Sequence, residues 1–258
     1  MARRKREDYP GAWHHVMHRG ARRAPIFKGD GDCNGFLDVV REAVGRFGLE
    51  VHAYALMPNH YHLLVRSTLG NLSEAMQYLN GTYTLWLNAR HHWDGPVFRG
   101  RFRSQLVTDE GHLHILLAYI HLNPVEAHLA YRVTDEAWTS HRAYVGKEAP
   151  PAWLTTKLFL ELLGGPEKLN EFVLSYRRGV LEYPEDFNPE TGLFRKRAVP
   201  IERPGRRGGR LKGSGSSGMT HPRQRSAEDV LKDVLELTGA TMAGLIKRCR
   251  VTSANGAR

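Results

Sequence analysis

The chain has 258 residues but only two cysteines, Cys33 and Cys249, which stand far apart in the sequence. Two distant cysteines exclude a disulfide framework and a CxxC metal site, so a reducing cytoplasm is the expected environment. Long hydrophobic runs are also lacking, because no stretch approaches the ~20 apolar residues of a membrane span. The basic N-terminus is not followed by the apolar segment of a signal peptide. We therefore expect a cytoplasmic protein that has no membrane partner.

Acidic residues are scarce relative to basic ones. The chain has 27 Asp and Glu against 37 Lys and Arg, which gives a net charge of +10 at pH 7. Most of this surplus lies in the segment 195–225, where Glu202 is the only acid among ten basic residues. A surplus of this size favours a polyanionic partner, most often nucleic acid. A basic tail with incidental affinity for polyanions is the alternative that composition leaves open.

Residues 1–145 show the pattern of one compact unit. Apolar residues recur at helical spacing in some stretches and alternate in others, and Gly or Pro marks several boundaries. The expected elements are strand 13–19, helix 32–47, strand 50–57, strand 60–66, helix 72–88, strand 103–108 and a helix from Asp109 to about Leu122 that ends near Pro124. This order predicts an α+β fold, namely a ferredoxin-like split βαβ sheet with one added helix.

The rest of the chain divides into three expected parts. Residues 146–187 have helical patterns and are expected to pack on the first unit as a helical extension. Residues 188–225 form a basic linker rich in Gly, Ser and Arg. Residues 226–258 contain two short helical patterns with a Gly-bearing turn between them, which suggests an incomplete helix-turn-helix. A small helical hairpin without a DNA-binding role explains the last pattern equally well.

Two histidines, His60 and His62, are separated by a single residue within the largely apolar stretch 56–65. Side chains at i and i+2 of a strand point to the same face of a sheet, so both imidazoles would converge on one point. Convergent imidazoles suit metal coordination, although packed or hydrogen-bonded histidines are the alternative. The same alternation places Tyr61 on the opposite face, where we expect it in the core.

The second half of this site is expected on the helix near Pro124. Tyr119 and Asn123 are four residues apart and therefore share one helix face. A tyrosine hydroxyl is a poor nucleophile at neutral pH, but it can attack a phosphodiester that a metal polarises. Asn123 offers an amide oxygen as a third ligand beside the two imidazoles, or it serves only as a helix-end residue. This ligand set suits Mg²⁺ or Mn²⁺, and Zn²⁺ stays open. His121 faces away from Tyr119 and is expected to be structural or exposed.

Several ordered motifs together resemble the single-tyrosine HUH transposases, and more closely the group of REP-associated tyrosine transposases. The resemblance covers roughly residues 8–145 and continues more weakly to about residue 180. It rests on these stretches: Tyr9-Pro10-Gly11-Ala12-Trp13-His14-His15-Val16, His18-Arg19-Gly20, Leu56-Met57-Pro58-Asn59-His60-Tyr61-His62-Leu63-Leu64-Val65 and Tyr119-Ile120-His121-Leu122-Asn123-Pro124-Val125.

This resemblance implies a metal-dependent nuclease and strand transferase that acts on single-stranded DNA near a hairpin. It implies that His60 and His62 are metal ligands, that Asn123 completes the site and that Tyr119 is the nucleophile. The product would be a 5′-phosphotyrosine with a free 3′-OH. Relatives of this kind act as homodimers or as monomers, and both states stay open for this chain.

Basic residues in two places are expected to contact DNA. Arg99, Arg101 and Arg103 alternate with aromatic residues, and basic side chains follow phosphates while aromatic rings can stack on bases. A solvated edge above two core phenylalanines is the alternative. Arg19, Arg22 and Arg23 form a second candidate patch.

Two other functions stay open at this stage. The first is a domesticated protein that binds hairpin or repeat DNA and cleaves it weakly or not at all. The second is an unrelated metal hydrolase, which would need a carboxylate base near the histidines. Glu126 is the candidate for that base.

Overall fold

The structure is a computed structural model that describes residues 6–109, 111–135 and 138–194. Its strands are β1 (Ala12–Arg19), β2 (Leu49–Met57), β3 (His60–Ser67), β4 (Arg103–Val107) and the short β5 (Phe187–Asn188) and β6 (Leu193–Phe194). Its helices are η1 (Ala21–Arg23), α1 (Asp30–Phe47), α2 (Leu72–His91), α3 (Gly111–Glu126), α4 (His141–Tyr144), α5 (Lys157–Leu163) and α6 (Pro166–Arg177).

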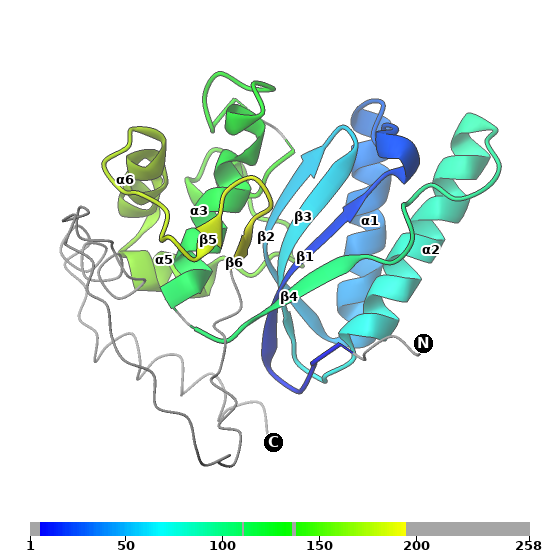
Figure 1. Cartoon of the computed structure of the whole chain (residues 1–258), viewed down its shortest axis with the longest axis horizontal. Helices are drawn as coiled ribbons and strands as arrows, with labels where there is room; N and C mark the ends of the chain where they lie inside the picture. The colour runs from blue at the N-terminus through cyan, green and yellow to red at the C-terminus, as the bar shows by residue number, and fades with distance from the viewer. Residues whose placement is uncertain (1–5, 110, 136–137, 195–258) are drawn as a thin grey trace, which may run out of the picture.

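The four long strands form one antiparallel sheet in the order β2-β3-β1-β4. Helices α1 and α2 cover one face of this sheet, and α3, with α5 and α6 beyond it, lies on the other side (Figure 1). The order of elements along the chain and the order of strands in the sheet are those of the split βαβ plan. The predicted α+β fold with an added helix is therefore confirmed.

Strand β3 separates the two cores by simple alternation of its side chains. Tyr61, Leu63 and Val65 belong to the core beneath α1 and α2, whereas Leu64 belongs to the core beneath α3. Tyr61 is fully buried and its hydroxyl donates a hydrogen bond to Asn80 Oδ1 at 2.8 Å. The expectation that Tyr61 is a core residue is confirmed, because a period of two sends it away from the histidines on either side.

Helix α3 is buried on all sides over most of its length, since every residue from Leu113 to Val125 is buried. Asp109 Oδ1 accepts a hydrogen bond from the Gly111 N–H at 2.8 Å, as expected for a capping residue. The helix runs on to Glu126 with Pro124 inside it, so its predicted end near Pro124 was too early. A proline in the last turn removes a single N–H donor, and the Pro124 carbonyl accepts from the Leu129 N–H at 2.8 Å.

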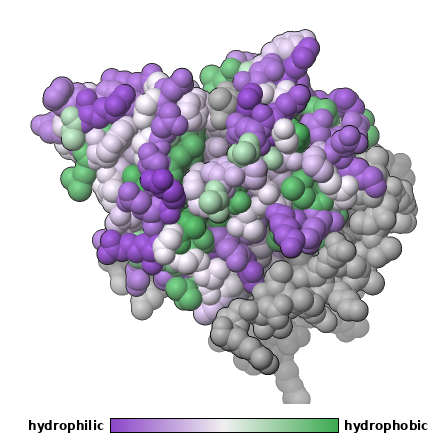
Figure 2. All heavy atoms as spheres, turned by 180° about the vertical axis from the view of Figure 1, so that it is seen from behind, coloured by the Kyte–Doolittle hydropathy of each residue, from purple (hydrophilic) through white to green (hydrophobic). Residues whose placement is uncertain are grey.

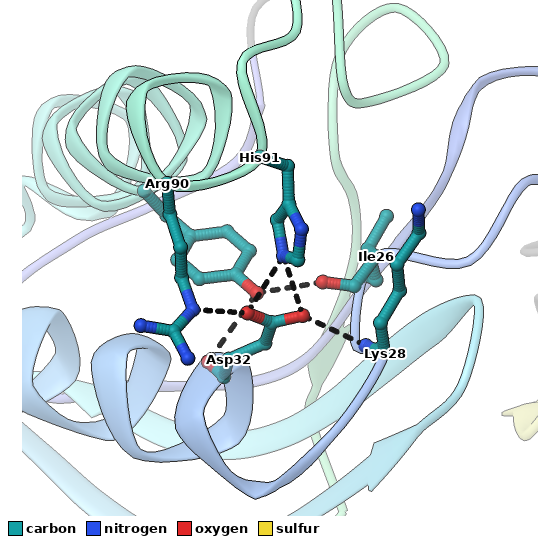
Figure 3. A network of polar contacts seen from close by, with 6 residues as sticks. Ile26, Lys28, Asp32, Arg90 and His91 are labelled. Carbon is teal, nitrogen blue, oxygen red and sulfur yellow. Dashed lines mark hydrogen bonds and ion pairs between the residues drawn. The ribbon is translucent and has the colours of Figure 1, made fainter.

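A buried carboxylate ties the start of α1 to the end of α2. Asp32, only 2% exposed, accepts hydrogen bonds from the Lys28 N–H at 2.8 Å and from Arg90 Nε at 3.0 Å. His91 Nε2 lies 2.9 Å from the same carboxylate (Figure 3). A carboxylate at a helix N-terminus also interacts favourably with the helix dipole. This network holds α1 and α2 together on the face of the sheet that they cover.

Beyond α3, the segment 146–187, for which helical patterns were expected, contains two helices, and one further feature was not predicted from the sequence. Helices α5 and α6 pack against α3, and the hairpin β5–β6 follows in the segment 187–194. Residue 188 was the expected start of the linker. The remaining linker, from 195 to 225, and the helix-turn-helix expected at 226–258 lie outside the described residues, as does Cys249.

The surface seen from behind is largely hydrophilic, with hydrophobic side chains scattered over it in small groups (Figure 2). The exposed large hydrophobic residues belong to different parts of the chain, among them Leu69, Leu85, Tyr131 and Val180. Scattered apolar residues of this kind are normal for a protein surface. Within the described ranges, no helix is long and apolar enough to cross a membrane.

Candidate active site

The two predicted metal ligands lie on the face of β3 that is turned toward α3. The ring centroids of His60 and His62 are 5.0 Å apart. His62 is 3% exposed, whereas His60 at the strand end is half-buried. The register pairs His60 with Arg19 and His62 with Met17 on β1. The two imidazoles therefore converge as predicted, at one end of the sheet.

Helix α3 brings Tyr119 and Asn123 to the same place. The Tyr119 ring lies edge-on to His62, with ring centroids 5.5 Å apart and an interplanar angle of 87°. Asn123 Nδ2 donates to the Tyr119 backbone carbonyl at 3.4 Å. The structure thus brings Tyr119 beside His62, with Asn123 one helical turn further along α3, although α3 and β3 are distant in the sequence.

Burial dominates the electrostatics of Tyr119. The loss of solvent raises the pKa of its hydroxyl to about 12, and the polar side chain of Asn123 only partly opposes this. Burial likewise lowers the pKa of His60 to about 4, with a smaller contribution from the positive charge of Arg19. The histidines are therefore neutral at pH 7, which is the form that binds metals.

The proton of His60 can be assigned from its neighbours. His60 Nδ1 lies 2.7 Å from Asn59 Oδ1, and Asn59 Nδ2 donates to the Arg23 carbonyl at 3.3 Å. The carbonyl can only accept, so the amide oxygen of Asn59 faces His60 and takes a hydrogen bond from its Nδ1–H. A neutral His60 then carries its lone pair on Nε2. This is the arrangement expected of a metal-binding histidine that a neighbouring group orients.

His15 on β1 is a member of the site that sequence reasoning missed. It pairs with Leu64 in the sheet and therefore shares the face of His62. Its ring is nearly parallel to that of His62, at 17° with centroids 5.2 Å apart, and the two rings meet edge to edge with His15 Nε2 2.9 Å from His62 Nδ1. The only signal in the sequence was its position in the predicted strand 13–19, where the pairing register was unknown.

The segment 183–194 covers the site and was also missed. The rings of Phe187 and Tyr183 lie 5.2 Å and 6.5 Å from that of Tyr119. The backbone of Gly192 approaches so closely that a Cβ atom there would lie 2.6 Å from Tyr119 Cζ. Gln105 on β4 anchors this cover, since its side-chain amide accepts from the Phe194 N–H at 2.9 Å and donates to the Phe194 carbonyl at 2.7 Å. As a result, Tyr119 is only 3% exposed.

The six arginines expected to contact DNA lie around the same end of the sheet. Gly20 bridges to Phe98, and the Arg99 N–H donates to the Arg19 carbonyl at 2.9 Å, so the two basic stretches are neighbours. Phe98 and Phe102 are buried in the core, so they are not available for stacking on bases in this state. The arginines between and after these two phenylalanines are exposed, and so are the two arginines of η1. Within the described chain, no ion pair is formed by any of the six arginines, which are Arg19, Arg22, Arg23, Arg99, Arg101 and Arg103.

His121 and Glu126 have other surroundings. His121 is fully buried and bonded to Ser140 and His141, which agrees with a structural role. Glu126 accepts a hydrogen bond from the Tyr183 hydroxyl at 3.3 Å, and burial raises the pKa of its carboxyl group. No cluster of three or more His, Cys, Asp or Glu side chains that could hold a metal occurs in the part of the chain described. A metal here would rely on two imidazoles and an amide oxygen.

Comparison with protein families identifies the region that contains this site. Residues 9–123 match the model of the family described as IS200-like transposase. The matched region includes β1, the histidine strand β3 and the helix positions of Tyr119 and Asn123. Over this region, which is slightly less than half of the chain, the sequence is similar to the IS200-like transposase family. This similarity points to DNA processing of the transposase type.

Three solved structures are similar to the chain at low identity. A REP-associated tyrosine transposase bound to a REP hairpin has 15% identity and a TM-score of 0.49, covering 60% of this chain and 92% of that one. A candidate transposase from Deinococcus radiodurans R1 has 20% identity and a TM-score of 0.34, covering 44% and 92%. The tRNA(His) guanylyltransferase of Saccharomyces cerevisiae has 10% identity and a TM-score of 0.35, covering 74% and 90%. The comparison with curated proteins gives no match.

Proposed function

We propose that the chain is a single-stranded DNA endonuclease and strand transferase with Tyr119 as its nucleophile. The observation that carries this proposal is the edge-on placement of Tyr119 against His62, with Asn123 bonded to the Tyr119 backbone carbonyl one turn along the same helix. The tyrosine can serve as a nucleophile toward a phosphodiester, and the two imidazoles and the amide oxygen can serve as ligands of a metal that polarises it.

The proposed step is a transesterification. The Tyr119 hydroxyl oxygen forms a bond to the scissile phosphorus while the bond from phosphorus to the 3′ oxygen breaks. The phenol gives up its proton, the departing 3′ oxygen takes one up, and the products are a 5′-phosphotyrosine and a free 3′-OH. The phosphoester is conserved in the protein–DNA link, so the reverse step can rejoin strands without another energy source.

His60, His62 and Asn123 are the residues that would hold a divalent metal such as Mg²⁺ or Mn²⁺. When bound, such an ion supplies a Lewis acid for a phosphate oxygen of the DNA. The donor set fits this role because His60, oriented by Asn59, keeps a lone pair on Nε2 in a neutral ring.

Access to Tyr119 requires the cover 183–194 to move, because a side chain that is 3% exposed cannot reach a phosphate. The same movement would readmit solvent and lower the pKa of the tyrosine, which burial holds near 12. The unpaired arginines beside the histidines would then guide a DNA strand to this end of the sheet. We propose a single-stranded DNA with an adjoining hairpin as the substrate.

A second candidate is a hairpin-binding protein whose cleavage is weak or absent. The observation that favours it is the burial of Tyr119 beneath Phe187 and Gly192. In that case the arginines retain their role and the cover stays in place. The two proposals differ in one product, the covalent protein–DNA adduct.

The test incubates the full chain with labelled hairpin DNA that carries a single-stranded flank, in Mg²⁺ or Mn²⁺. We expect a labelled covalent adduct that Tyr119→Phe abolishes. Tyr61→Phe is the matched control, since Tyr61 is equally buried but lies on the other face of β3, and this variant should retain the adduct. Binding without any adduct supports the second candidate, and an adduct that survives Tyr119→Phe contradicts the assignment of the nucleophile.

A further inference from the structure

A continuous line of polar contacts runs from the cover through His15 to His62. The Gly192 carbonyl lies 2.7 Å from His15 Nδ1, and His15 Nε2 lies 2.9 Å from His62 Nδ1. Both imidazoles are buried, with 1% of His15 and 3% of His62 exposed. The two rings are nearly parallel, at 17°. His15 therefore has a bonding partner at each nitrogen.

The protons along this line follow from simple bonding rules. A carbonyl oxygen only accepts, so His15 Nδ1 carries a proton that it donates to Gly192. The His15 ring is only 1% exposed, and its two partners are a carbonyl oxygen and an imidazole, so a positive charge on the ring would have no counter-charge beside it. The ring is therefore neutral and its Nε2 is an acceptor. His62 Nδ1 must then donate to His15 Nε2. It follows that the neutral His62 ring has its lone pair on Nε2.

We propose that His15 is a positioning residue that holds His62 in the tautomer whose Nε2 can bind a divalent cation. The proposal rests on the proposed function in taking the His60–His62 pair as the metal site. Asn59 does the same for His60 from the turn before β3, so each imidazole of the pair has its own orienting partner. Such partners fix the ring orientation of metal-binding histidines and strengthen their binding.

The role of His15 does not depend on the cover being closed. If the cover moves, the partner at His15 Nδ1 can be a phosphate oxygen of the DNA, which also only accepts. The proton then stays on Nδ1 and the acceptor at Nε2 stays directed at His62. His18, three residues along β1, is a useful contrast, because its ring stacks on Phe98 and bonds to Asn80 on the opposite face of the sheet.

The test uses three substitutions in the full chain. Glutamine places an amide oxygen near the position of the imidazole Nε2, so His15→Gln keeps an acceptor for His62. Asparagine reaches only the position of Nδ1, so His15→Asn keeps the bond to Gly192 and removes the acceptor. His15→Phe keeps the ring and removes both bonds. Thermal melting of each variant records any general loss of stability.

The first measurement is Mn²⁺ binding by titration calorimetry. We expect His15→Asn and His15→Phe to weaken binding by about 10- to 100-fold, and His15→Gln to retain most of the affinity. A packing role alone predicts that affinity follows the melting temperature, without rescue by Gln. Equal Mn²⁺ affinity in the wild type and in His15→Asn would overturn the proposal.

The second measurement is the ¹⁵N spectrum of the imidazoles in the metal-free wild type. The proposal requires His62 to be protonated at Nδ1, and protonation at Nε2 would overturn it. This measurement needs no variant to fold and no metal to bind. A wild type that binds no Mn²⁺ contradicts the metal site of the proposed function, and the spectrum still decides whether His15 sets the tautomer of His62.

Discussion

Gln105 on β4 holds the backbone of Phe194 through both ends of its side-chain amide, with N–H···O distances of 2.9 Å and 2.7 Å. This pair fastens the end of the segment that covers Tyr119. The link joins a strand of the sheet to a hairpin that lies almost ninety residues later in the chain. The accessibility of the proposed nucleophile therefore depends on an interaction that is remote from it in sequence.

Gln105→Ala is expected to speed the formation of the covalent adduct. The variant removes two hydrogen bonds of about 1 kcal/mol each from the covered state, which raises the fraction of open molecules about tenfold or more while that fraction is small. The measurement is the initial rate of adduct formation on labelled hairpin DNA. Gln77→Ala, at an exposed position of α2, is the control and should leave the rate unchanged. An unchanged rate in Gln105→Ala would show that the cover does not limit access.

The contrast between the predicted and the unpredicted parts of the site has a physical origin. His60 with His62, and Tyr119 with Asn123, lie within single elements, so the periods of a strand and a helix place them. The contact between His15 and His62 depends on the register between two strands, which the turn chemistry between β2 and β3 does not fix. The four strands of the main sheet and the helices α1, α2 and α3 are likewise long enough to show a regular apolar period. The exception is the end of α3 beyond Pro124, which the sequence did not predict. Strands of two residues, such as β5 and β6, have no period to recognise.

The arginines beside the site are expected to control DNA affinity through their interaction with phosphates. Replacing Arg99 and Arg101 together by Gln should weaken binding of single-stranded DNA. It should also reduce the slope of log K against log salt by about 0.7 for each phosphate that the variant no longer neutralises. Fluorescence anisotropy at several salt concentrations measures both quantities. Arg41→Gln, an exposed change on α1, is the matched control. Equal salt slopes in the double variant and the control would place the DNA elsewhere.

Asp32 is expected to be important for stability and not for chemistry. Asp32→Asn weakens the acceptor that Arg90, His91 and the Lys28 N–H share, at a cost of about 2–4 kcal/mol in the free energy of unfolding. Asp38→Asn is the control, because the Asp38–Arg41 pair is exposed and should contribute less than ~1 kcal/mol. Urea unfolding measures both variants. A loss no larger than that of the control would mean that the network in Figure 3 is not stabilising.

His114 should make the fold sensitive to acid. It is buried between Phe159 and Phe172, and this burial lowers its pKa to about 4, which the nearby Gly111 backbone only partly opposes. The unfolded chain takes up this proton near pH 6.5 and the folded chain does not. The contribution of neutral His114 to the free energy of unfolding is therefore fully present above pH 6.5. It is lost as the pH falls toward 4, by up to about 3 kcal/mol.

His114→Leu removes this titrating group without a large change in volume. We expect the variant to lose less stability than the wild type between pH 7 and pH 4.5, as measured by urea unfolding at each pH. His92→Asn removes an exposed histidine and should preserve the pH dependence of the wild type. Parallel pH profiles for His114→Leu and the wild type would refute a role for this side chain.

The central claim is that the Tyr119 oxygen becomes bonded to DNA. Mass spectrometry of the protease-digested adduct, formed by the wild-type chain on a hairpin substrate with Mn²⁺, identifies the residue that carries the nucleotide. We predict a 5′-phosphonucleotide on Tyr119 and an unmodified Tyr61. A nucleotide on any other residue, or cleaved DNA with no modified peptide, would contradict the account.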